Sequence, residues 1–241
     1  MPDPDYMHRQ TEINEKMRAI LVDWLIDVHR KFKLLPETLY LALNLMDRYM
    51  SLRPCARSKL QLVGVTAMLI ASKYEEIYAP EVRDFVYVSA HAYPRDEILA
   101  MERSIIAALD FNLTVPTAYS FVRRYLEAGT ADARQIKMSY FLLELAQQDF
   151  QMLRFPPSVQ SAAAVCLARK YLGAATMWAP EMQHYALYTE AALRPCIHGL
   201  HENVRAAQAS RFEALKKKYS LVENLEVAPV AFARASTIVD L

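Results

Sequence analysis

The sequence predicts an all-α protein built from two five-helix domains in tandem. Apolar residues recur with the helical period along most of the chain, and no segment alternates convincingly as a strand would. Only 4 of the 241 residues are glycine. Two short words also occur twice in the same order. ASKY at 71–74 returns as ARKY at 168–171, and YAPE at 78–81 returns as WAPE at 178–181, which indicates an internal repeat.

The first half contains five predicted helices. Asn14 is a plausible N-cap for the first, and Pro36 suits the first turn of the second. The third contains the apolar, small-residue stretch VTAMLIAS. The predicted ranges are Asn14–Lys33, Pro36–Ser51, Ser58–Glu76, 81–88 and 94–109.

The second half repeats this arrangement after a connector at 110–117. Its third helix contains SAAAVCLA, again rich in small residues, which let neighbouring backbones approach closely. We therefore expect each domain to pack around its third helix. The predicted helices are 117–128, 131–150, 157–172, 181–186 and 189–207, followed by a short one within 210–220. The expected divisions are 1–13, 14–112, 113–220 and a C-terminal tail, 221–241.

Composition excludes several classes of function. The net charge is +1, so binding of polyanions is not expected as the main activity. No window approaches eighteen uninterrupted apolar residues, and the first ten residues lack a signal-peptide pattern. Three widely spaced cysteines indicate a reduced intracellular protein without a disulfide framework.

No catalytic or metal-binding motif can be found. The chain has no glycine-rich phosphate loop, no GxSxG and no HExxH. The nearest metal candidate is Cys196-x-His198-x-x-His201, which is not a zinc spacing and lacks a fourth ligand. Glu75 and Glu76 are adjacent and do not converge on one helix face. We expect no enzymatic activity, no cofactor and no metal.

Several long words resemble a known family. MRAILVDWLIDV, LLPETLYLALNLMDRYMS, KLQLVGVTAMLIASKYEEIYAPEV and MERSIIAALDFNLTVP resemble the first cyclin box of an A/B-type cyclin. RFPPSVQSAAAVCLARKYL and QHYALYTEAALRPCIHGLHENV resemble the second box, and are closer to mitotic B-type cyclins. The resemblance covers about Pro4 to Ser220 and implies two tandem five-helix cyclin boxes, each packed around its central third helix.

The resemblance implies a regulatory subunit that activates a cyclin-dependent kinase by holding its αC helix and activation segment in the active conformation. The implied kinase contacts are Lys73 and Glu102, with Ile70, Phe111, Glu75 and Glu76 beside them. A lysine at the end of an apolar helix could donate to carbonyls of a partner while Glu102 orients its ammonium. From the residues alone, Lys73 could instead satisfy its own helix C-terminus, and Glu75 could belong to a solvated acidic tip.

The resemblance also implies a hydrophobic patch that docks Arg-x-Leu-type motifs of substrates or inhibitors. The implied patch is Met17, Ile20, Leu21, Trp24, Asp27, Arg57, Leu60 and Gln61. Asp27 stands where the family often has an acidic residue that pairs with the motif's arginine, and it is one methylene shorter than a glutamate. The alternative is that Met17 and Trp24 are ordinary core residues.

The helix that supplies this patch has two apolar arcs. On a helical wheel, Arg18 divides the arcs on one flank, and Asp23 and Asp27 divide them on the other. Because the third helix is expected to be central, the second arc, which contains Val22 and Ile26, has no obvious partner in its own domain. We therefore expect an exposed apolar face on this helix, flanked by Asp27.

The expected partners are a cyclin-dependent kinase and Arg-x-Leu-type substrates or inhibitors, without nucleic acid or membrane, in the nucleus and cytoplasm. The rival hypothesis is a cyclin-fold transcription adaptor that activates no kinase. The family's helix before the first box is not recognisable in residues 1–13. The tail, 221–241, has no clear period, and it is expected either to pack across the boxes or to be disordered.

Overall fold

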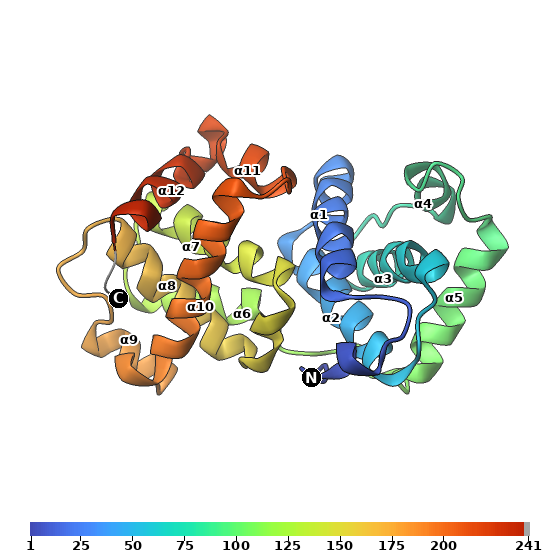
Figure 1. The fold of residues 1–241 in the computed structure, drawn as a ribbon, viewed down its shortest axis with the longest axis horizontal. Helices are drawn as coiled ribbons and strands as arrows, with labels where there is room; N and C mark the ends of the chain where they lie inside the picture. Colours follow the sequence, from blue (N-terminus) through green and yellow to red (C-terminus); the bar gives the residue numbers. More distant parts are fainter. Residues whose placement is uncertain (239–241) are drawn as a thin grey trace. The chain divides into compact units, whose positions relative to one another are not determined.

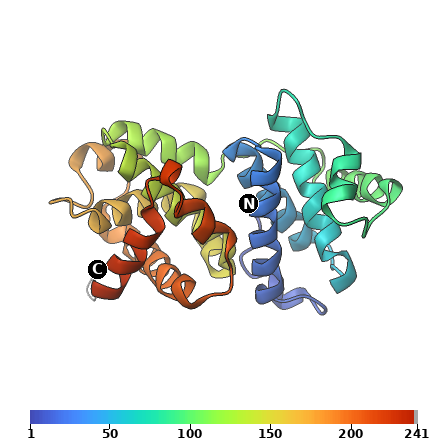
Figure 2. The same ribbon diagram turned by 90° about the horizontal axis from the view of Figure 1, so that it is seen from above.

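The protein is described by a computed structural model that covers residues 1–238. All regular elements in this range are α-helices or short 3-10 helices, joined by loops (Figures 1 and 2). The all-α prediction is confirmed. The chain divides into two compact units, Met1–Thr117 and the residues from Ala118 onwards. The change of unit falls a few residues after the predicted boundary at 112.

The first unit contains five α-helices. They are α1 (Glu15–Phe32), α2 (Pro36–Leu52), α3 (Leu60–Glu75), α4 (Val82–Val88) and α5 (Arg95–Ala108). The start of α1 confirms the predicted N-cap, because the side chain of Asn14 accepts a hydrogen bond from the backbone N–H of Met17 at 3.0 Å. Pro36 occupies the first turn of α2, where its missing N–H leaves no bond unmade.

The third helix is the centre of this unit, as predicted. Every residue from Leu62 to Ser72 is buried, so α3 is enclosed on all sides. It contacts α1, α2, α4 and α5. A short 3-10 helix, η2 (Arg57–Lys59), precedes the first turn of α3, and none of its residues is buried.

The second unit repeats this plan and adds two helices. Its helices are α6 (Ala118–Ala128), α7 (Ala133–Gln148), α8 (Pro157–Tyr171), α9 (Pro180–Ala186), α10 (Glu190–Ala209), α11 (Ala214–Tyr219) and α12 (Val227–Thr237). The central helix is α8, buried from Gln160 to Ala168 and in contact with α6, α7 and α10. The prediction of two five-helix boxes, each around its third helix, is confirmed.

The terminal segments are more ordered than their sequence patterns indicate. The expected tail forms α12, which packs against α7, α8 and α10 of its own unit, so neither expectation for it is correct over the described residues. Within the N-terminal segment, η1 (Tyr6–Arg9) buries Tyr6 completely. Both segments are short and aperiodic, so tertiary contacts, rather than local patterns, fix their structure.

The helical-wheel interpretation of α1 is wrong about the second apolar arc, and it did not indicate the burial of Arg18. Arg18 is 1% exposed, with its guanidinium bonded twice to Asp47 at 2.7 Å. Tyr6 donates to the same carboxylate at 2.9 Å. The second apolar arc is also buried, since Val22 and Ile26 have no exposed surface. The exposed apolar residues of α1 belong to the first arc, where Ile20 is the most exposed.

Candidate functional site

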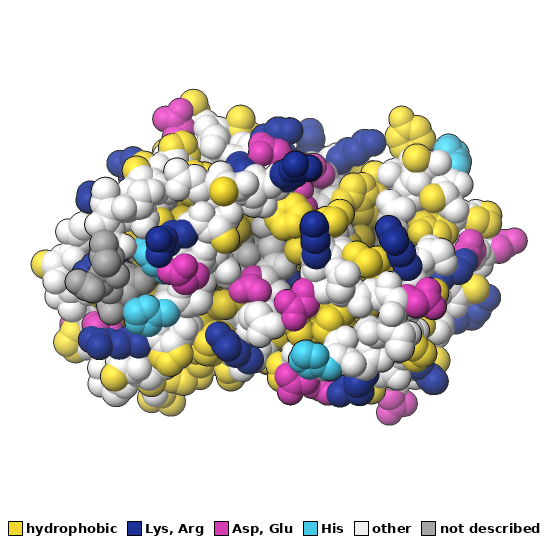
Figure 3. All heavy atoms as spheres, viewed as in Figure 1, with side chains coloured by type: hydrophobic (Ala, Val, Ile, Leu, Met, Phe, Trp, Pro, Cys, Tyr) yellow, Lys and Arg dark blue, Asp and Glu magenta, His cyan; other side chains and the backbone are white. Residues whose placement is uncertain are grey.

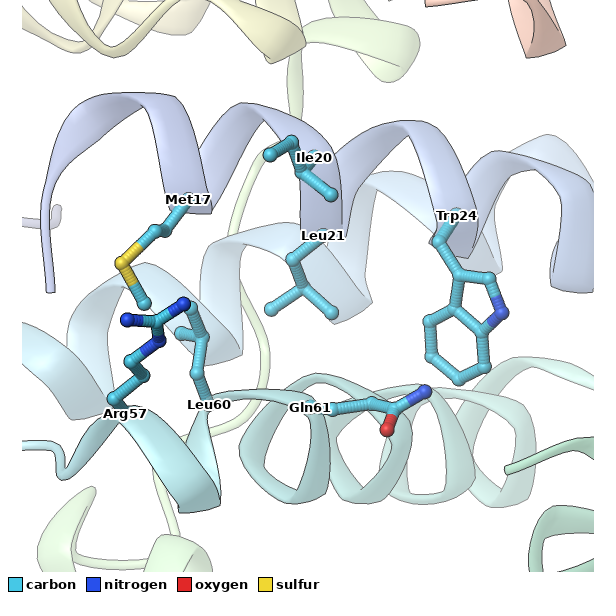
Figure 4. Close-up of a pocket in the computed structure, with 7 residues that line it drawn as sticks. All are labelled: Met17, Ile20, Leu21, Trp24, Arg57, Leu60 and Gln61. Carbon is cyan, nitrogen blue, oxygen red and sulfur yellow. The ribbon is translucent and has the colours of Figure 1, made fainter. Parts of the chain in front are cut away.

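A pocket of about 390 Å³ opens between α1 and α3. We call it the α1–α3 pocket. Its lining is Met17, Ile20, Leu21, Trp24, Arg57, Leu60 and Gln61 (Figure 4). The first four come from consecutive turns of α1. They share one face of the helix, because positions three or four residues apart are neighbours on its surface. The structure therefore brings together seven of the eight residues that the sequence assigned to a docking patch.

Close approach of the two helices shapes the floor of this pocket. A Cβ atom added at Gly64 of α3 would lie 2.9 Å from the methyl groups of Leu21. The absence of a side chain at Gly64 therefore lets Leu21 settle against α3, where it is buried. Ile20 stays exposed beside it, so the pocket combines a buried floor with an accessible apolar rim.

Asp27 is the predicted patch residue that does not line the pocket. It lies one turn beyond Trp24 on α1, is exposed, and forms an ion pair with Arg30 at 3.3 Å. Exposed ion pairs of this kind contribute little to stability, so the pair leaves the Asp27 carboxylate able to exchange partners.

A second surface lies at the C-terminal end of α3. Lys73 Nζ donates to both carboxylate oxygens of Glu102 on α5, at 2.8 and 3.1 Å. The ammonium is about half exposed, whereas Glu102 is mostly buried. The pairing of Lys73 with Glu102 agrees with the geometry expected from the sequence. Because Lys73 is held by one side and open on the other, it retains donors for a partner.

The two glutamates that end α3 have different environments. Glu76 accepts hydrogen bonds from the backbone N–H of Leu35 at 2.7 Å and from the Thr38 hydroxyl at 2.5 Å, so it caps the start of α2. Glu75 is partly buried beside Glu37 and Glu76. Desolvation, with the two neighbouring carboxylates, raises the pKa of Glu75 above its ordinary value. Glu76 thus has a structural role that its sequence context did not indicate.

Ile70 and Phe111 differ sharply in accessibility. Ile70 is buried on α3, so it supports the surface from beneath. Phe111 follows α5 in a turn where both Asp110 and Phe111 have left-handed backbone conformations (φ 51° and 57°), and its side chain is 76% exposed. Such conformations are costly for residues other than glycine. The turn therefore holds an aromatic ring in solvent.

Three further exposed residues at this surface were missed in the sequence. Tyr74, Ile77 and Tyr78 surround Lys73 in the sequence, and Tyr78 is 92% exposed. The Tyr74 hydroxyl is hydrogen-bonded to that of Thr114, which ties the turn containing Phe111 to the end of α3. We call Lys73, Tyr74, Ile77, Tyr78, Glu102 and Phe111 the α3-end surface. The sequence did offer a signal for them: large apolar residues stand just after the end of a helix, where no helical period requires them.

The Cys196, His198 and His201 triplet is not assembled into a site. Cys196 and His201 are buried while His198 is exposed. The Nδ1 atom of His201 is 2.8 Å from the Tyr171 hydroxyl, and desolvation lowers the pKa of His201. Within residues 1–238, no group of three or more His, Cys, Asp or Glu side chains is arranged to hold a metal ion. In the same range, no helix is both long and apolar enough to cross a membrane.

The two family models that match this chain meet close to the boundary between its two compact units. Residues 1–114 match the family described as the cyclin N-terminal domain, and residues 116–239 match the cyclin C-terminal domain. The resemblance found in the sequence is confirmed.

Curated relatives are B-type cyclins. The chain is 42% identical to a G2/mitotic-specific cyclin-B of Marthasterias glacialis, covering 98% of this chain and 61% of the relative. It is 47% identical to Cyclin-B1-4 of Arabidopsis thaliana, covering 93% of this chain and 58% of the relative. The chain therefore spans only about half to three fifths of the length of such relatives.

Solved structures share the fold at low sequence identity. A viral cyclin from herpesvirus saimiri matches with a TM-score of 0.73 and 17% identity, over 82% of this chain and 88% of that one. A chain of the yeast RNA polymerase II CTD kinase complex CTDK-1 matches with a TM-score of 0.71 and 12% identity, over 90% and 80%.

Proposed function

Because the chain belongs to the cyclin family, we propose that it binds and activates a cyclin-dependent protein kinase as a regulatory subunit in cell-cycle control. The curated B-type relatives support the mitotic class. The observation that carries the proposal is the α3-end surface. There, large apolar side chains are exposed just after α3 (Ile77, Tyr78) and just after α5 (Phe111), the two helices whose Lys73 and Glu102 form an ion pair. Exposed aromatic residues around fixed charges are typical of protein interfaces.

In this proposal, the chain acts by selecting one conformation of the kinase and contributes no catalytic group itself. A kinase is active only when its αC glutamate pairs with its β3 lysine. A rigid partner that binds this arrangement better than the inactive one shifts the population towards it. Moving the active state from about 1% to 99% requires a preference of about 5.5 kcal/mol.

The α3-end surface has the features that such a preference needs. Tyr78 and Phe111 offer apolar area that is now in water, so burying them against a kinase would be favourable. Lys73 is already oriented by Glu102 and therefore loses little side-chain freedom on binding. Glu75, beside Glu37, provides negative charge for a basic activation segment.

We further propose that the α1–α3 pocket docks Arg-x-Leu-type segments of substrates or inhibitors. Its apolar floor and rim fit a leucine side chain, and Asp27 lies one turn away to receive the arginine. A second binding site of this kind raises the local concentration of substrate at the kinase. We expect the protein to act in the nucleus and cytoplasm.

No observation on residues 1–238 favours the rival transcription adaptor. On the face shown in Figure 3, Lys and Arg side chains are interspersed with Asp and Glu, without a continuous basic stripe. Proteins whose main activity is binding DNA concentrate basic residues on one face.

The kinase proposal is tested by adding the purified chain to a panel of cyclin-dependent kinase catalytic subunits. We expect it to co-purify with at least one of them and to raise its phosphorylation rate, and we expect Lys73→Ala/Glu102→Ala to lose both effects. A chain that neither binds nor stimulates any kinase in the panel would refute the proposal. A labelled Arg-x-Leu peptide tests docking separately, by fluorescence polarisation against wild type and Met17→Ala/Trp24→Ala. Equal affinities would remove the pocket from the proposal.

A further inference from the structure

The turn that carries Phe111 is closed by local hydrogen bonds. The backbone N–H of Phe111 donates back to the carbonyl of Ile106 at 3.0 Å, and the N–H of Leu113 donates to the carbonyl of Phe111 at 3.1 Å. These bonds satisfy carbonyls at and just beyond the end of α5. Because they join residues within five positions of one another, they do not tie the turn to the rest of its unit.

A contact from a distant helix supplies such a tie. Arg48 lies near the end of α2, and its guanidinium donates to the backbone carbonyl of Asn112, the residue after Phe111, at 2.8 Å. Another nitrogen of the same guanidinium lies 3.5 Å from Oδ1 of Asn44, one turn earlier on α2. A hydrogen bond from a charged donor is stronger than one between neutral groups.

The helix that presents Arg48 is firmly packed. α2 contacts both α3 and α5, and the residues on either side of Arg48, which are Asp47 and Tyr49, are buried. The hydroxyl of Tyr49 is hydrogen-bonded to that of Ser104 on α5 at 3.0 Å. The end of α2 is therefore fixed relative to α5, and Arg48 can hold the turn after α5 in a defined place.

The far side of the turn is held from α3, where the Tyr74 hydroxyl is hydrogen-bonded to that of Thr114. Contacts at Asn112 and Thr114 thus restrain the chain just beyond Phe111. The ring of Phe111 adds little restraint of its own, because its side chain is 76% exposed. Its position is therefore set mainly through the backbone of the turn.

Restraint of this backbone matters for binding. Asp110 and Phe111 have positive φ angles of 51° and 57°, which are costly for residues other than glycine. A turn released from its contacts with other helices could adopt backbone conformations of lower local energy, which would move the ring. A partner would then have to order the turn during binding, and groups that are immobilised on association reduce affinity.

We propose that Arg48 is a positioning residue for kinase binding. By holding the carbonyl of Asn112, it keeps Phe111 in the position that a kinase meets, so that the turn need not be ordered on association. In this role Arg48 does not contact the kinase and acts only through the turn. The inference rests on the proposed kinase binding and adds a residue that lies outside the α3-end surface.

An arginine variant and a matched control measure the effect. Arg48→Met keeps a long apolar stem and removes the donors. We expect its affinity for the catalytic subunit that co-purifies with wild type to fall about three- to tenfold, as for the ordering of one flexible side chain. Arg53→Ala should bind like wild type. Arg53 directly follows α2, is exposed, and within residues 1–238 has no ion pair or hydrogen bond from its side chain.

A double-mutant cycle with Phe111→Ala distinguishes positioning from general stabilisation of the fold. Phe111→Ala alone should weaken kinase binding. On that background, Arg48→Met should cause no further loss, because the ring that Arg48 positions is already absent. A general effect on stability predicts instead the same fold-loss of affinity on both backgrounds.

Hydrogen exchange of the chain without a kinase examines the turn directly. The amides of residues 110–114 should exchange about fivefold faster in Arg48→Met than in wild type, because one hydrogen bond that restrains the turn is lost. The amides of 62–72, in the buried part of α3, should exchange at the wild-type rate.

The outcomes separate this inference from the proposed function. If Arg48→Met binds the kinase like wild type, or if its loss persists in full on the Phe111→Ala background, the inference is overturned while kinase binding stands. Unchanged exchange at 110–114 would also overturn it. If wild type binds no kinase, the proposed function fails and this inference falls with it.

Discussion

Similar sequence words lie at the end of each central helix (ASKY and ARKY) and shortly after it (YAPE and WAPE), but their aromatic residues are exposed in the first unit and buried in the second. In the first unit, Tyr78 of the word YAPE is 92% exposed. In the second, Trp178 of WAPE is 5% exposed, and its indole N–H donates to the carbonyl of Tyr188 at 2.8 Å. Tyr74 is likewise half exposed, whereas its counterpart Tyr171 is buried against His201.

This difference shows that the same arrangement of helices can either expose or bury the residues that follow its central helix. The loop after α3 covers residues 76–81, and the loop after α8 is longer, covering residues 172–179. The longer loop turns its aromatic residue inward, where it adds to the core of its own unit. The shorter loop leaves Ile77 and Tyr78 outside, where only a partner can bury them. The first unit therefore exposes the residues that we propose contact the kinase, and the second unit buries the equivalent position.

The largest effect is expected from matched lysine variants in the two units. Lys73 and Lys170 occupy the same place in ASKY and ARKY, but within residues 1–238 only Lys73 of the two forms an ion pair with a carboxylate. Lys73→Ala should lower affinity for the kinase by tenfold or more, because a kinase that covers this surface would bury Glu102 without its cation, and truncating one member of such a pair costs about 2–5 kcal/mol. Lys170→Ala should leave it nearly unchanged. Titration of kinase activity against each variant measures both, and equal losses would contradict the comparison.

The next largest effect concerns the buried charges of each unit. Arg18 and Asp47 are both enclosed, so Arg18→Ala leaves an unpaired buried carboxylate and should lower the free energy of unfolding by about 3–5 kcal/mol. In the second unit, Lys218 donates to buried Glu144, and Tyr219 donates to the same carboxylate at 2.6 Å, as Tyr6 does to Asp47. The Lys218 side chain is 16% exposed, against 1% for Arg18, so water can reach Glu144 once the lysine is removed. Lys218→Ala should therefore cost only about 1–3 kcal/mol.

Urea unfolding of both charge variants provides the measurement. Arg18→Met/Asp47→Leu is the informative control, because it removes both charges and should recover much of the lost stability. If this double variant is no more stable than Arg18→Ala, the cost does not arise from the unpaired carboxylate.

The aromatic pair is expected to separate an effect on stability from an effect on binding. Trp178→Ala should lower the free energy of unfolding by about 3–5 kcal/mol, since it empties a buried position. Tyr78→Ala should change it by less than about 0.5 kcal/mol, yet it should weaken kinase binding. Thermal unfolding combined with kinase pull-down distinguishes the two. A stable Trp178→Ala protein would show that the longer loop does not contribute to the core.

The smallest effect concerns thiol ionisation. Burial raises the pKa of Cys166 and Cys196 to about 12, and that of Cys55 to about 11. A raised thiol pKa stabilises the fold fully below about pH 9, the ordinary value, and this contribution is lost as pH rises towards 11–12. Native protein should therefore resist alkylation at pH 8, with Cys55 reacting first as pH rises. Mass spectrometry of iodoacetamide adducts measures the order, and earlier modification of Cys166 would contradict it.

Much of the fold follows from local patterns. The period of apolar residues, the N-cap at Asn14 and the proline at position 36 predict helix boundaries to within a few residues, because they depend on neighbours three or four positions away. The small residues in the third helix of each unit correctly predicted that these two helices are buried. The segments that escaped prediction, η1 and α12, are those with no local signal.

What the sequence determined by itself is the helical scaffold, its repeat and the family to which the chain belongs. Only the tertiary structure decided which side of α1 is open, that Arg18 is a core residue paired with Asp47, and that Glu76 caps a neighbouring helix. It also decided that Tyr78 and Trp178, in nearly identical words, face solvent and core respectively. The physical reason is that burial and charge pairing depend on residues distant in the chain, whereas helix formation depends on near ones.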